Sequence, residues 1–107
     1  RRYASGHLSD AGRCAIWGMA QRTNAEVAAL TNGVLLRCHD FNVLYLGHKS
    51  WGHPSDIIPA LVAVAEQRQA SGAAFLDALA VGYEVTLALF DTLPAASVGW
   101  DYSNLTS

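Results

Sequence analysis

Three stretches of this chain place apolar residues three or four positions apart, the spacing that puts side chains on one face of an α-helix. They span residues 23–39, 55–69 and 71–94. The apolar positions are Val27, Leu30, Val34 and Leu35, then Ile57, Ile58, Leu61 and Val62, then Phe75, Leu76, Leu79, Tyr83, Leu87 and Phe90. The sequence therefore predicts an all-α fold with three main helices, and the start of a fourth after a linker at residues 94–99.

Residues near the expected helix ends indicate how each helix begins. Thr23 with Glu26 matches a capping box, so the first helix is predicted to start at Thr23. The second is expected to start near Ser55 and Asp56, both favoured in the first turn of a helix, and the third is expected to be capped by Ser71. Gly33 inside the first helix costs about 1 kcal/mol relative to alanine, so we expect close packing there.

Composition limits the classes of protein to which the chain belongs. It has 107 residues, 51% hydrophobic and 15% charged, which fits one folded domain or part of one and not a disordered segment. A net charge of −2 gives no reason to expect a nucleic acid or an anionic membrane as partner. No apolar run is long enough to predict a membrane span. Cys14 and Cys38 show no metal or disulfide spacing and are expected to be reduced thiols.

The polar segment at residues 37–56 is the expected location of chemistry, since it holds three of the four histidines between two apolar helices. Asp40 follows a helix C-terminus, where the dipole disfavours a negative charge. Its carboxylate then either finds a donor or has a raised pKa and accepts protons, or it simply ends the helix in an Asx turn. His53 precedes Pro54, which favours an extended backbone and a projecting ring suited to acid–base chemistry, although a histidine in a loop more often has no such role.

Other polar residues of this segment suggest anion binding more than metal binding. The three histidines match no metal-ligand spacing, so no metal is predicted. Arg37 and Lys49 are candidates to hold substrate carboxylates, although single loop cations are often only solvated. The amides at the helix start near Ser55 are a candidate anion site.

The order of five short motifs carries a family resemblance. They are residues 28–33 (Ala-Ala-Leu-Thr-Asn-Gly), 37–42 (Arg-Cys-His-Asp-Phe-Asn), 52–56 (Gly-His-Pro-Ser-Asp), 82–85 (Gly-Tyr-Glu-Val) and 99–101 (Gly-Trp-Asp). In this order the chain resembles the 2-methylcitrate dehydratase family (MmgE/PrpD), which also includes cis-aconitate decarboxylases. The resemblance covers residues 11–102, nearly the whole chain.

The resemblance implies a large helical N-terminal domain, of which residues 1–107 are part, and a smaller α+β lid domain supplied by later sequence. It implies a cytoplasmic or mitochondrial-matrix lyase that acts on a small di- or tricarboxylic acid as a homodimer, without an iron–sulfur cluster or other cofactor. Asp40 and His53 match the family's active-site aspartate and histidine, and are expected to meet at one cavity. Asn42, Lys49 and Ser55 are the expected substrate-binding residues.

Two departures keep a second hypothesis open. Val43 and Leu44 replace the Asp-Thr that the family pattern carries after its third position, and Tyr102 replaces a histidine. Leucine lacks the hydroxyl with which threonine binds a substrate carboxylate. The chain is therefore interpreted either as part of a dehydratase, with decarboxylation or epimerisation as variants, or as a non-catalytic relative that keeps only the helical scaffold. The chain alone is expected to be an inactive piece with an exposed apolar patch.

Overall fold

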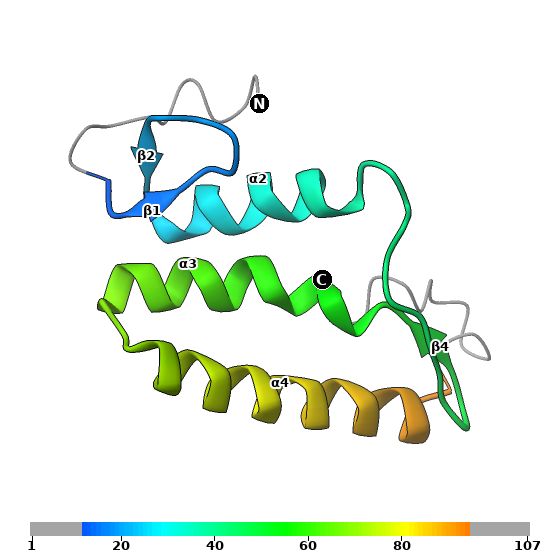
Figure 1. Ribbon diagram of the computed structural model, residues 1–107. Helices are drawn as coiled ribbons and strands as arrows, with labels where there is room; N and C mark the ends of the chain where they lie inside the picture. Colours follow the sequence, from blue (N-terminus) through cyan, green and yellow to red (C-terminus); the bar gives the residue numbers. More distant parts are fainter. Residues whose placement is uncertain (1–11, 95–107) are drawn as a thin grey trace.

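The computed structural model describes residues 12–94, which form a layer of three antiparallel helices (Figure 1). The helices are α2 (Ala25–Arg37), α3 (Ile58–Arg68) and α4 (Gly72–Thr92). Helix α3 lies between α2 and α4 and packs against both. The three predicted main helices are thus confirmed, whereas the predicted start of a fourth lies outside the described residues.

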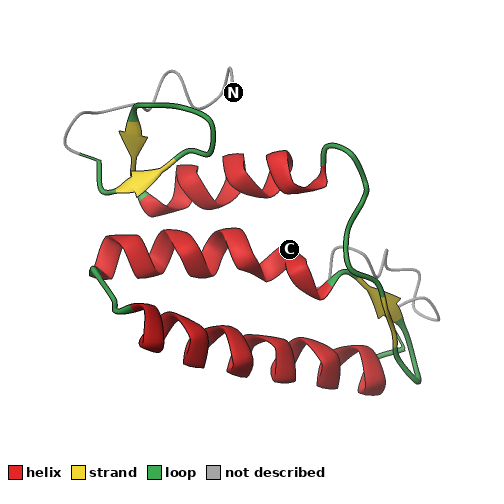
Figure 2. Ribbon diagram, in the orientation of Figure 1, coloured by secondary structure: helices red, strands yellow, loops and turns green. Residues whose placement is uncertain are grey.

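Two small antiparallel sheets add to the helices, so the chain is mostly helical and not purely all-α (Figure 2). One sheet pairs β1 (Cys14–Ala15) with β2 (Arg22–Thr23), and the other pairs β3 (Tyr45–Leu46) with β4 (Trp51–Gly52). The first lies beside the start of α2, and the second lies at the end of the layer where α4 finishes (Figure 1). Strands of two residues are too short to show an alternating pattern, so periodicity did not predict them.

The first helix is capped by a residue other than the predicted one. Asn24 is the cap, and its side-chain oxygen accepts the Val27 N–H at 2.9 Å. Thr23 instead pairs with Cys14 in the small sheet and is fully buried. The predicted capping box of Thr23 and Glu26 is therefore wrong, because α2 starts at Ala25 with Asn24 as its cap, while Thr23, two residues before the helix, pairs with Cys14.

Of the other helix ends, one agrees with the prediction and two do not. A 3₁₀ turn, η1 (Pro54–Ile57), replaces the predicted first turn of the second helix, and α3 begins only at Ile58. Ser71 is the cap of α4, as predicted, and its hydroxyl accepts the Ala74 N–H at 3.2 Å. Helix α2 ends at Arg37, before the predicted end at His39.

The core joins α2, α3 and the first sheet through small residues. Cys14, Ala28 and Ala63 form one buried cluster, and the Cys14 thiol donates to the Ala63 carbonyl at 3.2 Å. Burial raises the pKa of the Cys14 thiol. Asn32 is fully buried, accepts the Trp17 N–H at 3.0 Å and donates to the Ala15 carbonyl at 2.9 Å. Both cysteines are free thiols, as predicted.

The β3–β4 hairpin is fixed to the C-terminal end of α4. The ring of Phe90 is fully buried and leaves no room for a side chain at Gly52, where an added Cβ would lie 2.4 Å from the ring. The Phe90 carbonyl accepts two hydrogen bonds from Ser50, one from its N–H at 2.9 Å and one from its side-chain hydroxyl at 3.1 Å. The Asp91 carboxylate accepts the Tyr45 O–H at 3.1 Å, and this hydrogen bond raises the pKa of Tyr45. These contacts set the position of the polar segment.

Large apolar side chains remain exposed along the layer, as the sequence predicted. They include Leu30 and Val34 on α2, Val64 on α3, and Leu76, Val81 and Val85 on α4. Helix α4 is also long and apolar enough to cross a bilayer, which the sequence analysis did not expect. That finding rests on length and composition alone, and apolar helices of soluble proteins meet the same criteria.

Gly33 is not the close-packing point that the sequence predicted, because no atom lies within 4 Å of a Cβ built there. We expect Gly33→Ala to raise the free energy of unfolding by about 0.5–1 kcal/mol, since alanine loses less backbone entropy in a helix. Gly82→Ala is the matched control: its Cβ would lie 2.8 Å from Cδ1 of Ile57, so it should gain less or lose stability. Urea unfolding measures both. A Gly33→Ala variant that is less stable than the parent would contradict the observation that the space around this position is open.

Candidate functional site

Arg37, in the last turn of α2, contacts three other residues of the polar segment. Its Nη2 atom lies 3.2 Å from Oδ1 of Asp40, and its Nη1 donates to Oδ1 of Asn42 at 3.5 Å. Its Nε atom lies 4.0 Å from Oδ1 of Asp56. One guanidinium therefore joins groups that precede the hairpin to a group that follows it.

Asp40 lies just beyond the end of α2 in the left-handed region, with φ 49°. Aspartate tolerates this conformation better than most residues. The Asp40 N–H donates to the Arg37 carbonyl at 3.0 Å, while the side chain is 77% exposed. The structure thus shows that the Asp40 carboxylate has a cationic donor, which is the Arg37 guanidinium. Asp40 is thus both a helix terminator and a solvent-accessible partner of Arg37.

His53 is held by a backbone contact. Its Nδ1 atom lies 2.8 Å from the Val43 carbonyl, which assigns the Nδ1 proton to that hydrogen bond and leaves Nε2 as the proton-accepting nitrogen. The predicted extended backbone is confirmed by φ −112° and ψ 91°. The Trp51 ring meets the imidazole edge-on, with ring centroids 6.3 Å apart. These contacts restrict how the ring can turn.

Asp56 is the buried acid of the site. Its side chain is 5% exposed, and among the described residues its Oδ1 atom has no hydrogen-bond partner. Burial raises the pKa of Asp56, and Asp40 adds to the rise, whereas Arg37 and His53 lower it. Asp40 and His53 therefore both act electrostatically on Asp56.

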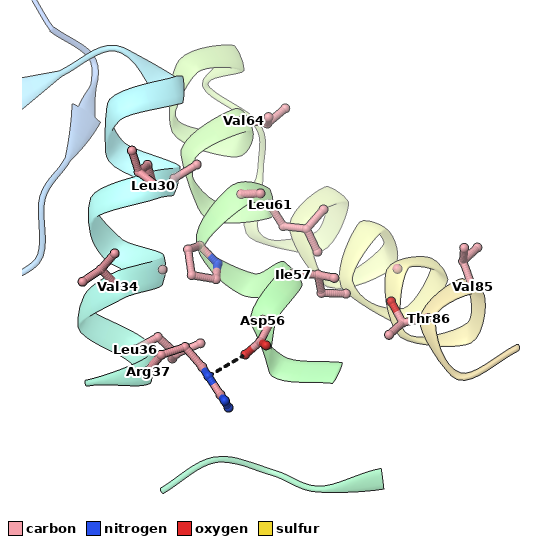
Figure 3. A pocket seen from close by; sticks show the side chains of 15 residues that line it. Leu30, Val34, Leu36, Arg37, Asp56, Ile57, Leu61, Val64, Val85 and Thr86 are labelled. Carbon is pink, nitrogen blue, oxygen red and sulfur yellow. Dashed lines mark ion pairs between the residues drawn. The ribbon is translucent and has the colours of Figure 1, made fainter. Parts of the chain in front are cut away.

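A cavity of about 860 Å³ lies between the three helices and ends at the Arg37–Asp56 pair (Figure 3). The cavity is open to solvent along the exposed apolar face of the layer, because its apolar walls include Leu30 and Val85, which are 55% and 56% exposed, as well as Leu61. The only other polar side chain that lines it, among the described residues, is that of Thr86. An apolar hollow with a few convergent polar groups is the usual form of a small-molecule site.

The expected substrate-binding residues divide into two groups. Asn42 belongs to the cluster, because it accepts from Arg37 and its amide donates to the Leu36 carbonyl at 3.3 Å. Ser55 is buried next to Asp56, with a hydroxyl that has no partner among the described residues. Lys49 is exposed on the hairpin turn, where its N–H donates to the Phe90 carbonyl at 3.3 Å, and no contact joins it to Arg37 among residues 12–94.

Neither Asp40 nor His53 lines the cavity, so the structure does not show them meeting there as the sequence analysis expected. Asp40 contacts Arg37, and the His53 carbonyl accepts the Asp56 N–H at 3.0 Å. The cavity therefore reaches the two expected residues through Arg37 and Asp56. Sequence reasoning considered Asp56 only as a helix-start residue, since nothing in its local sequence indicates that α2 will cover it. In residues 12–94, no three His, Cys, Asp or Glu side chains gather as a metal site.

The raised pKa of Asp56 makes stability depend on pH. The folded state binds the Asp56 proton more tightly than the unfolded state, so this stability is present at low pH and is lost as pH rises through the raised pKa. We expect Asp56→Asn to remove this loss of stability, so the variant gains stability relative to the parent as pH rises from about 4, the ordinary pKa of aspartate, through the raised pKa of Asp56. Urea unfolding across this range measures it, with exposed Asp77→Asn as control. A stability difference independent of pH would contradict the assignment.

Comparison with known proteins places the site in a family context. Residues 1–107 match the family model described as the MmgE/PrpD N-terminal domain. The matched range includes every residue of the Arg37 cluster and all five motifs that carried the resemblance. No solved structure matches the chain.

Proposed function

The chain belongs to the MmgE/PrpD family, and we propose that it is part of a cofactor-independent lyase that dehydrates a small di- or tricarboxylic acid such as 2-methylcitrate. The observation that carries the proposal is the Arg37 cluster. It gathers Asp40, Asn42 and Asp56 around one guanidinium, beside an imidazole held by the chain. A cation for a carboxylate and a fixed base are what such a reaction needs first.

Dehydration removes a proton from the carbon next to a carboxylate and expels a hydroxyl group from the neighbouring carbon. His53 is suited to remove the proton, because its Nδ1–H is engaged with the Val43 carbonyl and its Nε2 accepts. Arg37 is suited to bind a substrate carboxylate by two parallel hydrogen bonds. Asp40 and Asn42 orient the guanidinium, and Asp40 is exposed enough to meet the substrate itself.

Replacement of the family's Asp-Thr pair by Val43 and Leu44 does not remove the hydrogen bond that holds the His53 ring. Both side chains are exposed, and the contact with His53 comes from the Val43 main-chain carbonyl. The altered side chains favour a substrate with a different carboxylate pattern. They also motivate the alternative of a non-catalytic relative, which would keep the exposed apolar face for association only.

We further propose that the full-length protein adds a lid domain and forms a homodimer, with that apolar face available for such contacts.

The test is an activity panel with the full-length protein. We expect 2-methylcitrate or a related hydroxy acid to lose water, followed as the rise in ultraviolet absorbance of the unsaturated product. Carbon dioxide release from cis-aconitate would show decarboxylation in place of dehydration. Absence of turnover across hydroxylated di- and tricarboxylates would overturn the proposal and favour the non-catalytic relative.

A further inference from the structure

Asp56 has a chemical environment unlike that of Asp40, the other acid in the cluster. Its side chain is 5% exposed and lines the polar end of the cavity, whereas that of Asp40 is 77% exposed. The Oδ1 atom has no hydrogen-bond partner among residues 12–94, and its nearest described cation is Nε of Arg37 at 4.0 Å. Buried polar atoms without partners are uncommon and costly, so this oxygen is suited to a group on a bound molecule (Figure 3).

The groups that face Asp56 decide which form of the carboxyl is favoured. Arg37 from α2 and His53 from the preceding segment favour the ionised form, while Asp40 opposes it. Burial outweighs the effects of Arg37 and His53, so the pKa of Asp56 is raised. A buried carboxyl with a raised pKa next to a cation is suited to donate a proton during a reaction, because the cation stabilises the carboxylate that forms.

We propose that Asp56 is the general acid of the dehydration, donating its proton to the departing hydroxyl group of the substrate. The assignment rests on the proposed function and adds a catalytic residue to it. In the step, Nε2 of His53 takes the α proton, and the electrons of that C–H bond form the C=C bond. The C–O bond breaks, and its oxygen leaves as water with the proton of Asp56. Asp56 is left as a carboxylate and His53 as an imidazolium, and transfer of one proton from His53 to Asp56 restores both.

A substrate with a different leaving group tests this role. Fluoride departs without a proton, so an analogue with fluorine in place of the hydroxyl group needs the base but not the acid. We expect Asp56→Asn to lower kcat for the hydroxy acid by roughly 100- to 10,000-fold, with KM little changed. The same variant should eliminate fluoride from the analogue within a few-fold of the parent rate. An ultraviolet assay and a fluoride electrode measure the two reactions.

Three further variants sharpen the result. His53→Ala should lose both reactions, since both need the base. Asp56→Glu, which keeps an acid, should recover part of the dehydration that Asp56→Asn loses. Asp77→Asn, an exposed change on α4, should alter neither reaction.

Each other outcome overturns an identified part of the account. Equal loss of both reactions in Asp56→Asn would make Asp56 a structural or positioning residue, and full dehydration in that variant would remove any role as acid. Either result leaves the proposed function standing. A parent protein that converts neither compound overturns the proposed function, and the role of Asp56 with it.

Discussion

His53→Ala is expected to lower kcat of the full-length protein by roughly 100- to 10,000-fold, the usual contribution of a positioned acid or base. KM should change far less, because in the proposed mechanism His53 takes a proton from the substrate and Arg37 binds its carboxylate. The expected loss follows from removing the Nε2 atom proposed to accept the α proton, on a ring that the Val43 carbonyl holds through Nδ1. Steady-state kinetics with the best acid of the panel measures it.

His48→Ala is the matched control for this prediction. His48 belongs to the same polar segment and is exposed, and its described contact is made by its backbone N–H, which donates to Asp91 at 2.9 Å. Alanine keeps that N–H, so His48→Ala should retain normal kinetics. Equal losses in the two variants would indicate a disturbed hairpin and not a missing base.

Phe90→Ala is expected to lower the free energy of unfolding by about 3–5 kcal/mol, the range for truncation of a buried aromatic side chain. The ring is fully buried and fills the space above Gly52, with Tyr45 packed at a centroid distance of 6.3 Å. Such a loss is a large share of the stability of a typical domain. Urea unfolding followed by circular dichroism measures it.

A second change on the same helix controls for the Phe90 result. Leu76 is 62% exposed, so Leu76→Ala should lower stability by no more than about 0.5 kcal/mol. The Phe90 variant should also lose turnover, since the hairpin that leads to His53 depends on that anchor. Wild-type stability in Phe90→Ala would contradict the docking of the hairpin on α4.

Helix periodicity was enough to predict α2, α3 and α4, because their inward faces follow the helical repeat over several turns. The cap of α2 was misassigned by one residue, since Thr23 and Asn24 are both good caps and only pairing with Cys14 removes Thr23 from that role. Gly33 was misread because local sequence does not report whether a neighbouring helix reaches a given face.

The candidate site was predicted in part for the same physical reason. Asp40 and His53 were singled out by a helix end and a following proline, which are local signals. Burial of Asp56 arises from packing of α2 against the η1 turn, a contact between distant parts of the chain. Lys49 was grouped with the site by sequence proximity, whereas docking of the hairpin on α4 places its backbone against Phe90.

The central claim is that Asp40 and His53 serve one site through the Arg37 cluster. A double-mutant cycle in kcat/KM tests it most directly, with Asp40→Asn, His53→Ala and the double variant of the full-length protein. The effects of substituting residues that act as a unit do not add. We therefore predict that kcat/KM of the double variant is little lower than that of the less active single variant. Losses that multiply would mean that the two residues act independently, and would contradict the shared site.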